Sequence, residues 1–217
     1  MMVRDMAMTA LALVVVLDTR PAEAQDPARI LERVDSALTA PQDVVATQRV
    51  VLIDADGGEK ERTLRVYQRG RDRRLVKFVS PADVRDVGFL RIAEDQLYLY
   101  LPAFRRVRRI ASSIKHENFM GTDLSYEDLS RTRFGDDYHA IDLTMYDRAY
   151  TLTLEPRADA DVSYRRILMR VDPETWTIAE LSLYGSDGNL VKTIMASDVR
   201  QVGHYWIAHR LEVRSEG

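Results

Sequence analysis

The side chains that most often carry out chemistry in proteins are scarce in this sequence and poorly spaced for it. The chain has no cysteine, which excludes thiol catalysis, disulfides and a lipidated N-terminal cysteine. Two of its four histidines, His204 and His209, lie five residues apart on an expected strand, where they point to opposite faces and cannot share an ion. The sequence holds neither a glycine-rich phosphate loop nor a Gly-x-Ser-x-Gly elbow. These patterns predict no metal site and no cofactor.

Glu127 and Asp128 are adjacent acids near the middle of the chain. A pair of carboxyl groups is the machinery of glycoside hydrolysis, but neighbouring residues on a helix do not face one another. Ser125, three residues before Asp128, makes the pair typical of a capping box instead. We therefore predict no catalytic residues, and a secreted hydrolase is the weakest functional alternative.

Four arginines fall within five residues, at positions 105, 106, 108 and 109. On a short strand they place two guanidinium groups on each face, which could bind phosphates or carboxylates. The same charges would also protect an edge strand from pairing with another chain. Arg106 and Arg108 are our candidate contacts to a lipid headgroup or a protein partner. The net charge of −3 shows no basic excess, which argues against a nucleic-acid partner.

One helix is expected just after residue 25. Asp26 and Pro27 are typical of an N-cap and first helical position, and Pro41 follows the helix end. Apolar residues recur at helical spacing, while Asp35 is assigned to the polar side. The apolar positions are Ile30, Leu31, Val34 and Leu38.

From residue 44 onward the hydrophobic period changes to two, which predicts strands. Asp56-Gly57-Gly58 and the segment 186–189 are typical hairpin turns. The loops are too short for parallel crossovers, so we expect eleven or twelve strands in one large curved antiparallel sheet. Residues 112–135 interrupt the alternation, and an insertion of this length is often functional.

Several expected strands are apolar on both faces. In 96–101, leucines alternate with Tyr98 and Tyr100, and residues 87–89 and 205–207 are also apolar on both sides. One leading helix and one short insertion cannot cover two faces of so many strands. The uncovered face must be closed by the sheet itself, by a partner or by an apolar ligand. A filled β-core without a cavity is the alternative.

Two blocks of the sequence resemble a known family. The first, 101–110, combines a Leu-Pro strand end with the arginine-rich strand, and the second, 118–129, contains Phe119-Met120-Gly121. Both are similar to the signature of the outer-membrane lipoprotein-sorting (LolA-like) proteins, and looser similarity covers most of the mature chain. The resemblance implies a mainly β fold with a few helices, in which a large curved antiparallel sheet forms an incomplete β-barrel capped by helices around an apolar cavity.

The resemblance also implies a function and a site. It implies a non-enzymatic, monomeric periplasmic carrier that binds lipoprotein acyl chains or lipid and works with an inner-membrane exporter. A periplasmic sensor that regulates a membrane partner is the alternative. The expected cavity and lid residues are Phe78, Phe89, Tyr98, Tyr100, Phe119 and Met120. Phe119 and Met120 beside the hinge residue Gly121 suit a movable lid, or alternatively a fixed plug at the barrel end.

The N-terminus is typical of an export signal. Arg4, an apolar run over 7–17 and the small-x-small site 22–24 predict a signal peptide over residues 1–24, with cleavage before Gln25. A cytosolic N-terminal helix is the alternative. We expect residues 25–217 to form a single LolA-like domain of a periplasmic protein that does not span the membrane. Members of the family continue past the position of Glu212, so the resemblance implies a shortened C-terminus.

Overall fold

The structure, a computed structural model, describes residues 26–53, 56–93 and 96–216. Over these residues it contains twelve strands, two α-helices and three short 3-10 turns. The predicted fold class, mainly β and antiparallel with few helices and no closed barrel, is therefore confirmed. The predicted signal peptide over residues 1–24 and its cleavage site before Gln25 lie outside the described residues.

The leading helix, α1 (Pro27–Thr39), forms as its sequence predicts. The Asp26 carboxylate accepts a hydrogen bond from the backbone N–H of Ala28 at 3.0 Å, and proline occupies the first turn. The buried side chains include Ile30, Leu31 and Val34. The prediction for Asp35 is wrong, because this carboxylate is only 1% exposed and faces the protein interior.

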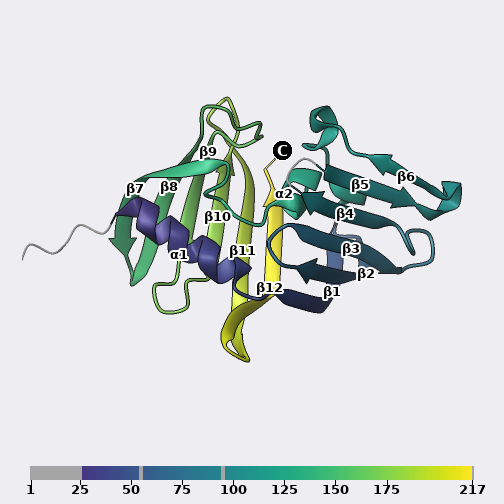
Figure 1. The fold of residues 1–217 in the computed structure, drawn as a ribbon, viewed down its shortest axis with the longest axis horizontal. Coiled ribbons are helices and arrows are strands. Elements are labelled where there is room, and N and C mark those ends of the chain that lie inside the picture. The colour runs from purple at the N-terminus through teal and green to yellow at the C-terminus, as the bar shows by residue number, and fades with distance from the viewer. Residues whose placement is uncertain (1–25, 54–55, 94–95, 217) are drawn as a thin grey trace, which may run out of the picture.

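The first six strands form one antiparallel meander, which we call the first sheet (Figure 1). Each strand pairs with its sequence neighbours, because short turns return the chain directly alongside itself. Gly57, in the β1–β2 turn, has φ +84°, a conformation that glycine adopts without steric cost. The strands are β1 (Asp43–Ile53), β2 (Glu59–Arg69), β3 (Arg73–Ser80), β4 (Gly88–Ala93), β5 (Gln96–Leu101) and β6 (Arg106–Arg109).

The last six strands form a second antiparallel meander, the second sheet. The prediction of one large sheet is therefore wrong: the strands are divided between two sheets, because the segment 110–137 separates β6 from the next strand along the chain. Figure 1 shows the sheets side by side, with α1 lying across the second one. The strands are β7 (Tyr138–Tyr146), β8 (Ala149–Pro156), β9 (Arg166–Val171), β10 (Ile178–Tyr184), β11 (Leu190–Val202) and β12 (Tyr205–Ser215).

Each sheet has its own apolar core on its inner face. On the second sheet, α1 packs against β7 to β11, and residues such as Leu152 and Met169 are fully buried. On the first sheet, the covering element is the segment 110–137, which contributes Phe119 and Tyr126 to the core. Within the described residues, helices are too short and too polar to cross a bilayer.

Candidate functional site

The segment 110–137, which we call the junction, contains the whole of the second signature block. It holds η2 (Ser112–Ile114), η3 (Phe119–Gly121) and α2 (Tyr126–Ser130). A tight loop brings the backbone N–H of Phe119 within 2.7 Å of the Leu124 carbonyl oxygen. The insertion predicted from its loss of period two therefore folds as a compact cover between the sheets.

The predicted capping box is confirmed at the start of α2. The Ser125 hydroxyl accepts a hydrogen bond from the Asp128 backbone N–H at 3.0 Å, and the Asp128 carboxylate accepts one from the Ser125 N–H at 2.9 Å. This box fixes a helix of a single turn, which alone would be too short to be stable. Successive α2 residues then face opposite ways. Tyr126 enters the first sheet's core, whereas Glu127 contacts Ser163 and Asp128 contacts Lys192, both in the second half of the chain.

An aromatic cluster fills the inner face of the first sheet. The Phe119 ring lies 5.4 Å from that of Phe78, 6.0 Å from that of Phe89 and 5.5 Å from that of Tyr126, centroid to centroid. Phe78 and Phe89 are fully buried, and Phe119 is 1% exposed. The Arg62 guanidinium donates a hydrogen bond to the Met120 carbonyl oxygen, which holds the loop over the cluster. The interior of this half is thus packed with the protein's own rings.

The structure brings four of the six predicted cavity and lid residues together. Phe78, Phe89 and Phe119 form the aromatic cluster, and Met120 packs at its edge. Tyr98 and Tyr100 lie on the opposite face of β5, because alternate residues of that strand (Leu97, Leu99 and Leu101) contact the cluster. Tyr100 is 38% exposed there.

The two predicted contact arginines lie at the rim of the same inner face. Arg106 and Arg108 are exposed on β6, the edge strand of the first sheet. In the register, Arg106 is opposite Leu101 and Arg108 is opposite Leu99. Because residues opposite each other on paired strands share a face, both guanidinium groups stand on the side of the aromatic cluster.

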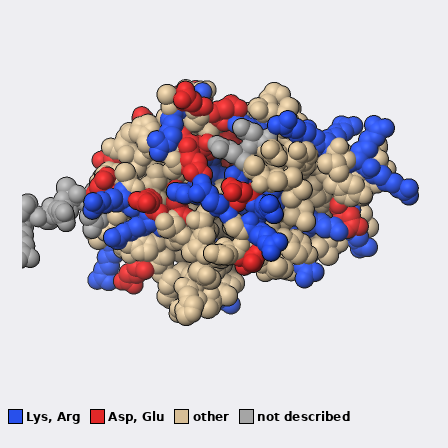
Figure 2. Space-filling view, in the orientation of Figure 1, with Lys and Arg blue, Asp and Glu red and all other residues tan. Residues whose placement is uncertain are grey.

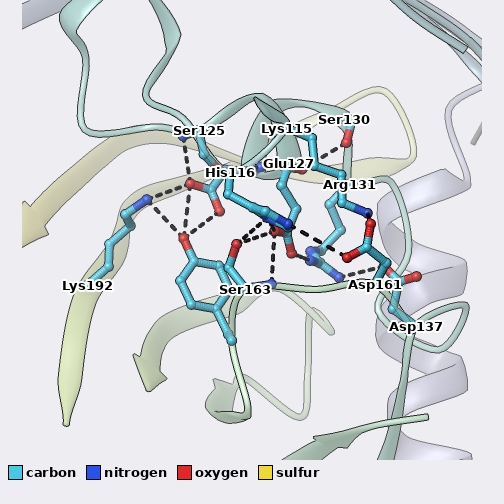
Figure 3. A network of polar contacts seen from close by, with 12 residues as sticks. Lys115, His116, Ser125, Glu127, Ser130, Arg131, Asp137, Asp161, Ser163 and Lys192 are labelled. Atoms are coloured by element: carbon cyan, nitrogen blue, oxygen red, sulfur yellow. Dashed lines mark hydrogen bonds and ion pairs between the residues drawn. The ribbon is translucent and has the colours of Figure 1, made fainter. Parts of the chain in front are cut away.

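A buried ion pair ties α2 to the second sheet. The Lys192 ammonium on β11 is 2.6 Å from the Asp128 carboxylate, and each side chain is 7% exposed (Figure 3). The Tyr164 hydroxyl donates to the same carboxylate at 3.0 Å and accepts from the Lys192 ammonium at 2.9 Å. Burial, and next the negative charge of Asp128, raise the pKa of Tyr164, so the phenol stays protonated and remains a donor.

Glu127 forms a second polar group on the other side of the α2 turn. One carboxylate oxygen is 2.5 Å from the Arg131 guanidinium, which also contacts Asp137 at 2.8 Å. Burial opposes the charge of Arg131, but Tyr138, Glu127 and Asp137 outweigh it, so the pKa of Arg131 lies above its usual value. Arg131 is therefore a permanent cation at the centre of the junction.

The other oxygen of Glu127 meets Ser163 and His116 in a constellation that invites comparison with a catalytic triad. The Ser163 hydroxyl donates to Glu127 at 2.6 Å. His116 Nδ1 lies 2.8 Å from Glu127 and 2.5 Å from the Ser163 oxygen. In a triad, serine and acid contact different ring nitrogens. Here both contact Nδ1, so the geometry differs from that of a triad, and the contacts tie α2 and His116 to Ser163.

Two hollows of the described residues are lined by side chains other than the rings of the aromatic cluster. A cavity of about 220 Å³ lies beside the Glu127 group and is lined mainly by charged side chains, including Lys115, Arg131 and Asp161. A second hollow lies against α1 and Trp176. Sequence reasoning missed Ser163, Tyr164 and Lys192 as partners of the junction. The one available signal was the lysine within the otherwise apolar run of β11.

The sequence and the fold are both similar to those of known proteins. A family model described as that of an uncharacterized protein matches residues 70–216. No curated protein matches the sequence. A candidate outer membrane lipoprotein-sorting protein domain from Vibrio parahaemolyticus is 26% identical, with a TM-score of 0.76 over 88% of this chain and 87% of that one.

Two further solved structures have a similar fold. A DUF1329 family protein from Desulfovibrio piger gives the same identity of 26%, a TM-score of 0.76 and coverage of 88% and 87%. A LolA superfamily protein from Nitrosomonas europaea shares the fold at 21% identity and a TM-score of 0.69, over 89% of this chain and 87% of that one. The fold of two meandering sheets bridged by a helical junction is therefore similar to that of a LolA superfamily protein. The chain belongs to the family of the matched model and has a LolA-like fold, and it is similar over most of its length to a lipoprotein-sorting protein domain and a DUF1329 family protein.

Proposed function

We propose that this protein is a periplasmic carrier that holds the acyl chains of a lipoprotein or lipid and moves them toward the outer membrane. The single observation that carries the proposal is the position of Phe119. This ring is seated in the middle of the first sheet's apolar inner face, yet it belongs to a loop rather than to the sheet. The similarity to a lipoprotein-sorting domain over 88% of the chain supports the choice of ligand.

The loop can move without dismantling the fold. Met120 and Gly121 both have left-handed backbone conformations, with φ of +50° and +72°, and such a conformation costs a non-glycine residue about 1–2 kcal/mol. Opening the loop would release that strain at Met120. The neighbouring helix α2 would stay in place, because Asp128 is bound to Lys192 and Tyr164.

The energetics favour exchange of the ring for an acyl chain. Exposing a buried phenylalanine costs about 1.5–3 kcal/mol, whereas each buried methylene contributes about 0.8 kcal/mol. A chain of some sixteen carbons would therefore outweigh the loss of Phe119 even when it is loosely packed. The opposing cost keeps binding reversible, as a carrier that must release its cargo requires. The cationic rim of Arg106 and Arg108 would face the headgroup or the acidic flank of a lipoprotein.

Substitution of the plug tests this proposal. We expect Phe119→Ala to bind a fluorescent fatty acid at least about tenfold more tightly than the wild type, because the ligand no longer displaces a ring. Phe119→Leu, a milder change, should give a smaller gain in the same direction. Leu152→Ala, in the core of the second sheet, is the matched control and should leave the affinity unchanged.

Affinity that is unchanged or weaker in both Phe119 variants, with folding verified by circular dichroism, would show that the ring is a fixed part of the core. Native mass spectrometry of the purified protein should reveal a co-purified lipid. Transfer of radiolabelled lipoprotein between membranes in vitro would then distinguish a carrier from a sensor that only binds.

A further inference from the structure

The hairpin between β11 and β12 projects beyond the second sheet. Pairing of β11 with β10 ends at Met195, whereas pairing with β12 continues to Val202. Residues 196–211 therefore form a two-stranded ribbon with no third strand, which we call the arm. Figure 1 shows the arm, in yellow, extending past the ends of the other strands.

The arm exposes apolar side chains on both of its faces. Apart from the half-buried alanines at 196 and 208, every residue of the arm is exposed. Trp206 is 44% and Tyr205 is 39% exposed, and they point to opposite faces because they are consecutive on a strand. Val202, 52% exposed, is opposite Tyr205 in the register. The projecting end is largely uncharged in the view of Figure 2.

The arm carries basic but no acidic residues near its tip. From Val199 to Leu211 the sequence contains two arginines and two histidines and no acid. Arg200 is 2.6 Å from Asp198 at the base of the arm. Arg210 forms no ion pair within the described part of the chain. The tip thus combines amphipathic aromatic rings with a basic flank.

From these observations we infer that the arm is a membrane-docking element that inserts its tip into the interface of an anionic lipid surface. Tryptophan and tyrosine favour the headgroup level of a bilayer, and basic residues nearby are attracted to anionic lipids. A protein partner would typically cover one face of a narrow ribbon. A lipid interface surrounds an inserted tip on all sides, which matches apolar residues on both faces.

Docking by the arm is independent of the acyl site, since the arm belongs to the second sheet and the aromatic cluster to the first. The two proposals can therefore fail separately. The Phe119→Ala variant should dock on vesicles as the wild type does, whatever its affinity for fatty acids.

Trp206 is a convenient fluorescence probe because the chain has two tryptophans, so a single substitution leaves Trp206 as the one that emits. The other, Trp176, stacks on Tyr150 at 6.1 Å and is removed as a signal by Trp176→Phe. In that background we expect Trp206 emission to shift to the blue on addition of vesicles of equal parts phosphatidylglycerol and phosphatidylcholine. Brominated lipids should quench it, and 0.5 M salt should weaken binding.

Vesicle co-sedimentation supplies the matched comparison. Trp206→Ser should reduce affinity for the anionic vesicles at least about tenfold, since the side chain loses its apolar contact with the bilayer. Tyr146→Ser is the control, because Tyr146 is more exposed (81%) but lies at the β7–β8 turn, so its loss should have no effect. An unshifted Trp206 spectrum, or equally strong binding to pure phosphatidylcholine, would overturn the inference. Capture of a protein through the arm in the absence of vesicle binding would overturn it in favour of protein docking.

Discussion

At the scale of single residues, Asp35 shows how α1 is locked to the junction. Its two carboxylate oxygens accept hydrogen bonds from the backbone N–H groups of Phe134 and Gly135, each at 2.8 Å. Burial raises the pKa of Asp35, although these two hydrogen bonds and the charge of Arg133 partly oppose that effect. Close approach also requires Gly135, because a Cβ there would lie 2.8 Å from the Asp35 carboxylate.

The raised pKa predicts the pH dependence of an Asp35→Asn variant. Between the ordinary carboxyl pKa and the higher folded value, the folded chain holds more protons than the unfolded chain, so wild-type stability falls as pH rises. Asparagine does not titrate and can accept only one of the two N–H groups well. We expect Asp35→Asn to be destabilised by about 1–3 kcal/mol, most strongly near pH 4 and less at pH 7. Urea unfolding across this range measures the difference, and a gap that widens with pH would contradict it.

At the scale of elements, β6 and the junction together form the rim of the first sheet's inner face. β6 is a short edge strand of four residues, all of them exposed. A charged edge strand resists pairing with other chains, and that role needs no particular sign of charge. Recognition of an anionic headgroup would need positive charge. The two interpretations of this strand can therefore be separated by reversing its charge.

We expect the double reversal Arg106→Glu and Arg108→Glu to weaken lipoprotein loading about tenfold or more, because two guanidinium contacts are replaced by repulsion. Loading is measured by pull-down of radiolabelled lipoprotein. The control is Arg29→Glu with Arg148→Glu, which makes the same change in net charge at exposed positions on the other half of the molecule. Unchanged loading would leave protection of the edge as the role of these arginines.

At the scale of the whole molecule, the one-turn helix α2 joins two halves whose described strands do not pair with one another. Tyr126 is buried in the first core, while Asp128 reaches the Lys192 ammonium of the second sheet. A buried charge left without its partner costs about 3–5 kcal/mol, so this contact couples the stability of the halves. In a carrier, the same coupling would hold α2 fixed while the Phe119 loop moves.

A double-mutant cycle tests that coupling. Lys192→Met and Asp128→Asn should each destabilise the protein by about 3–5 kcal/mol, the first by leaving a buried carboxylate unpaired and the second by leaving a buried ammonium unpaired. The double variant should be more stable than the sum predicts by about 1–3 kcal/mol. Urea unfolding followed by tryptophan fluorescence gives the three values. Strict additivity would mean that the two groups do not interact across the junction.

Much of this protein could be predicted from local sequence patterns. Period-two alternation, glycine turns and short loops predicted the antiparallel strands, and the capping box of Ser125 and Asp128 was visible as a motif because its partners are three residues apart. Phe78, Phe89 and Phe119 were predicted to line a cavity, and they lie together in the first core because they stand at apolar positions of their segments; their role in binding a ligand stays a prediction.

Only the tertiary structure decided which side chains fill the interior and which polar contacts hold the junction in place. Alternation shows that two faces differ, but it does not show which one is covered, so Tyr98 and Tyr100 were grouped with residues on the opposite face. Contacts such as that between Lys192 and Asp128 join residues 64 positions apart, and no local spacing encodes them. Periodicity indicates which residues of a strand or helix share an apolar face. Which other residues cover that face depends on how the elements pack in three dimensions.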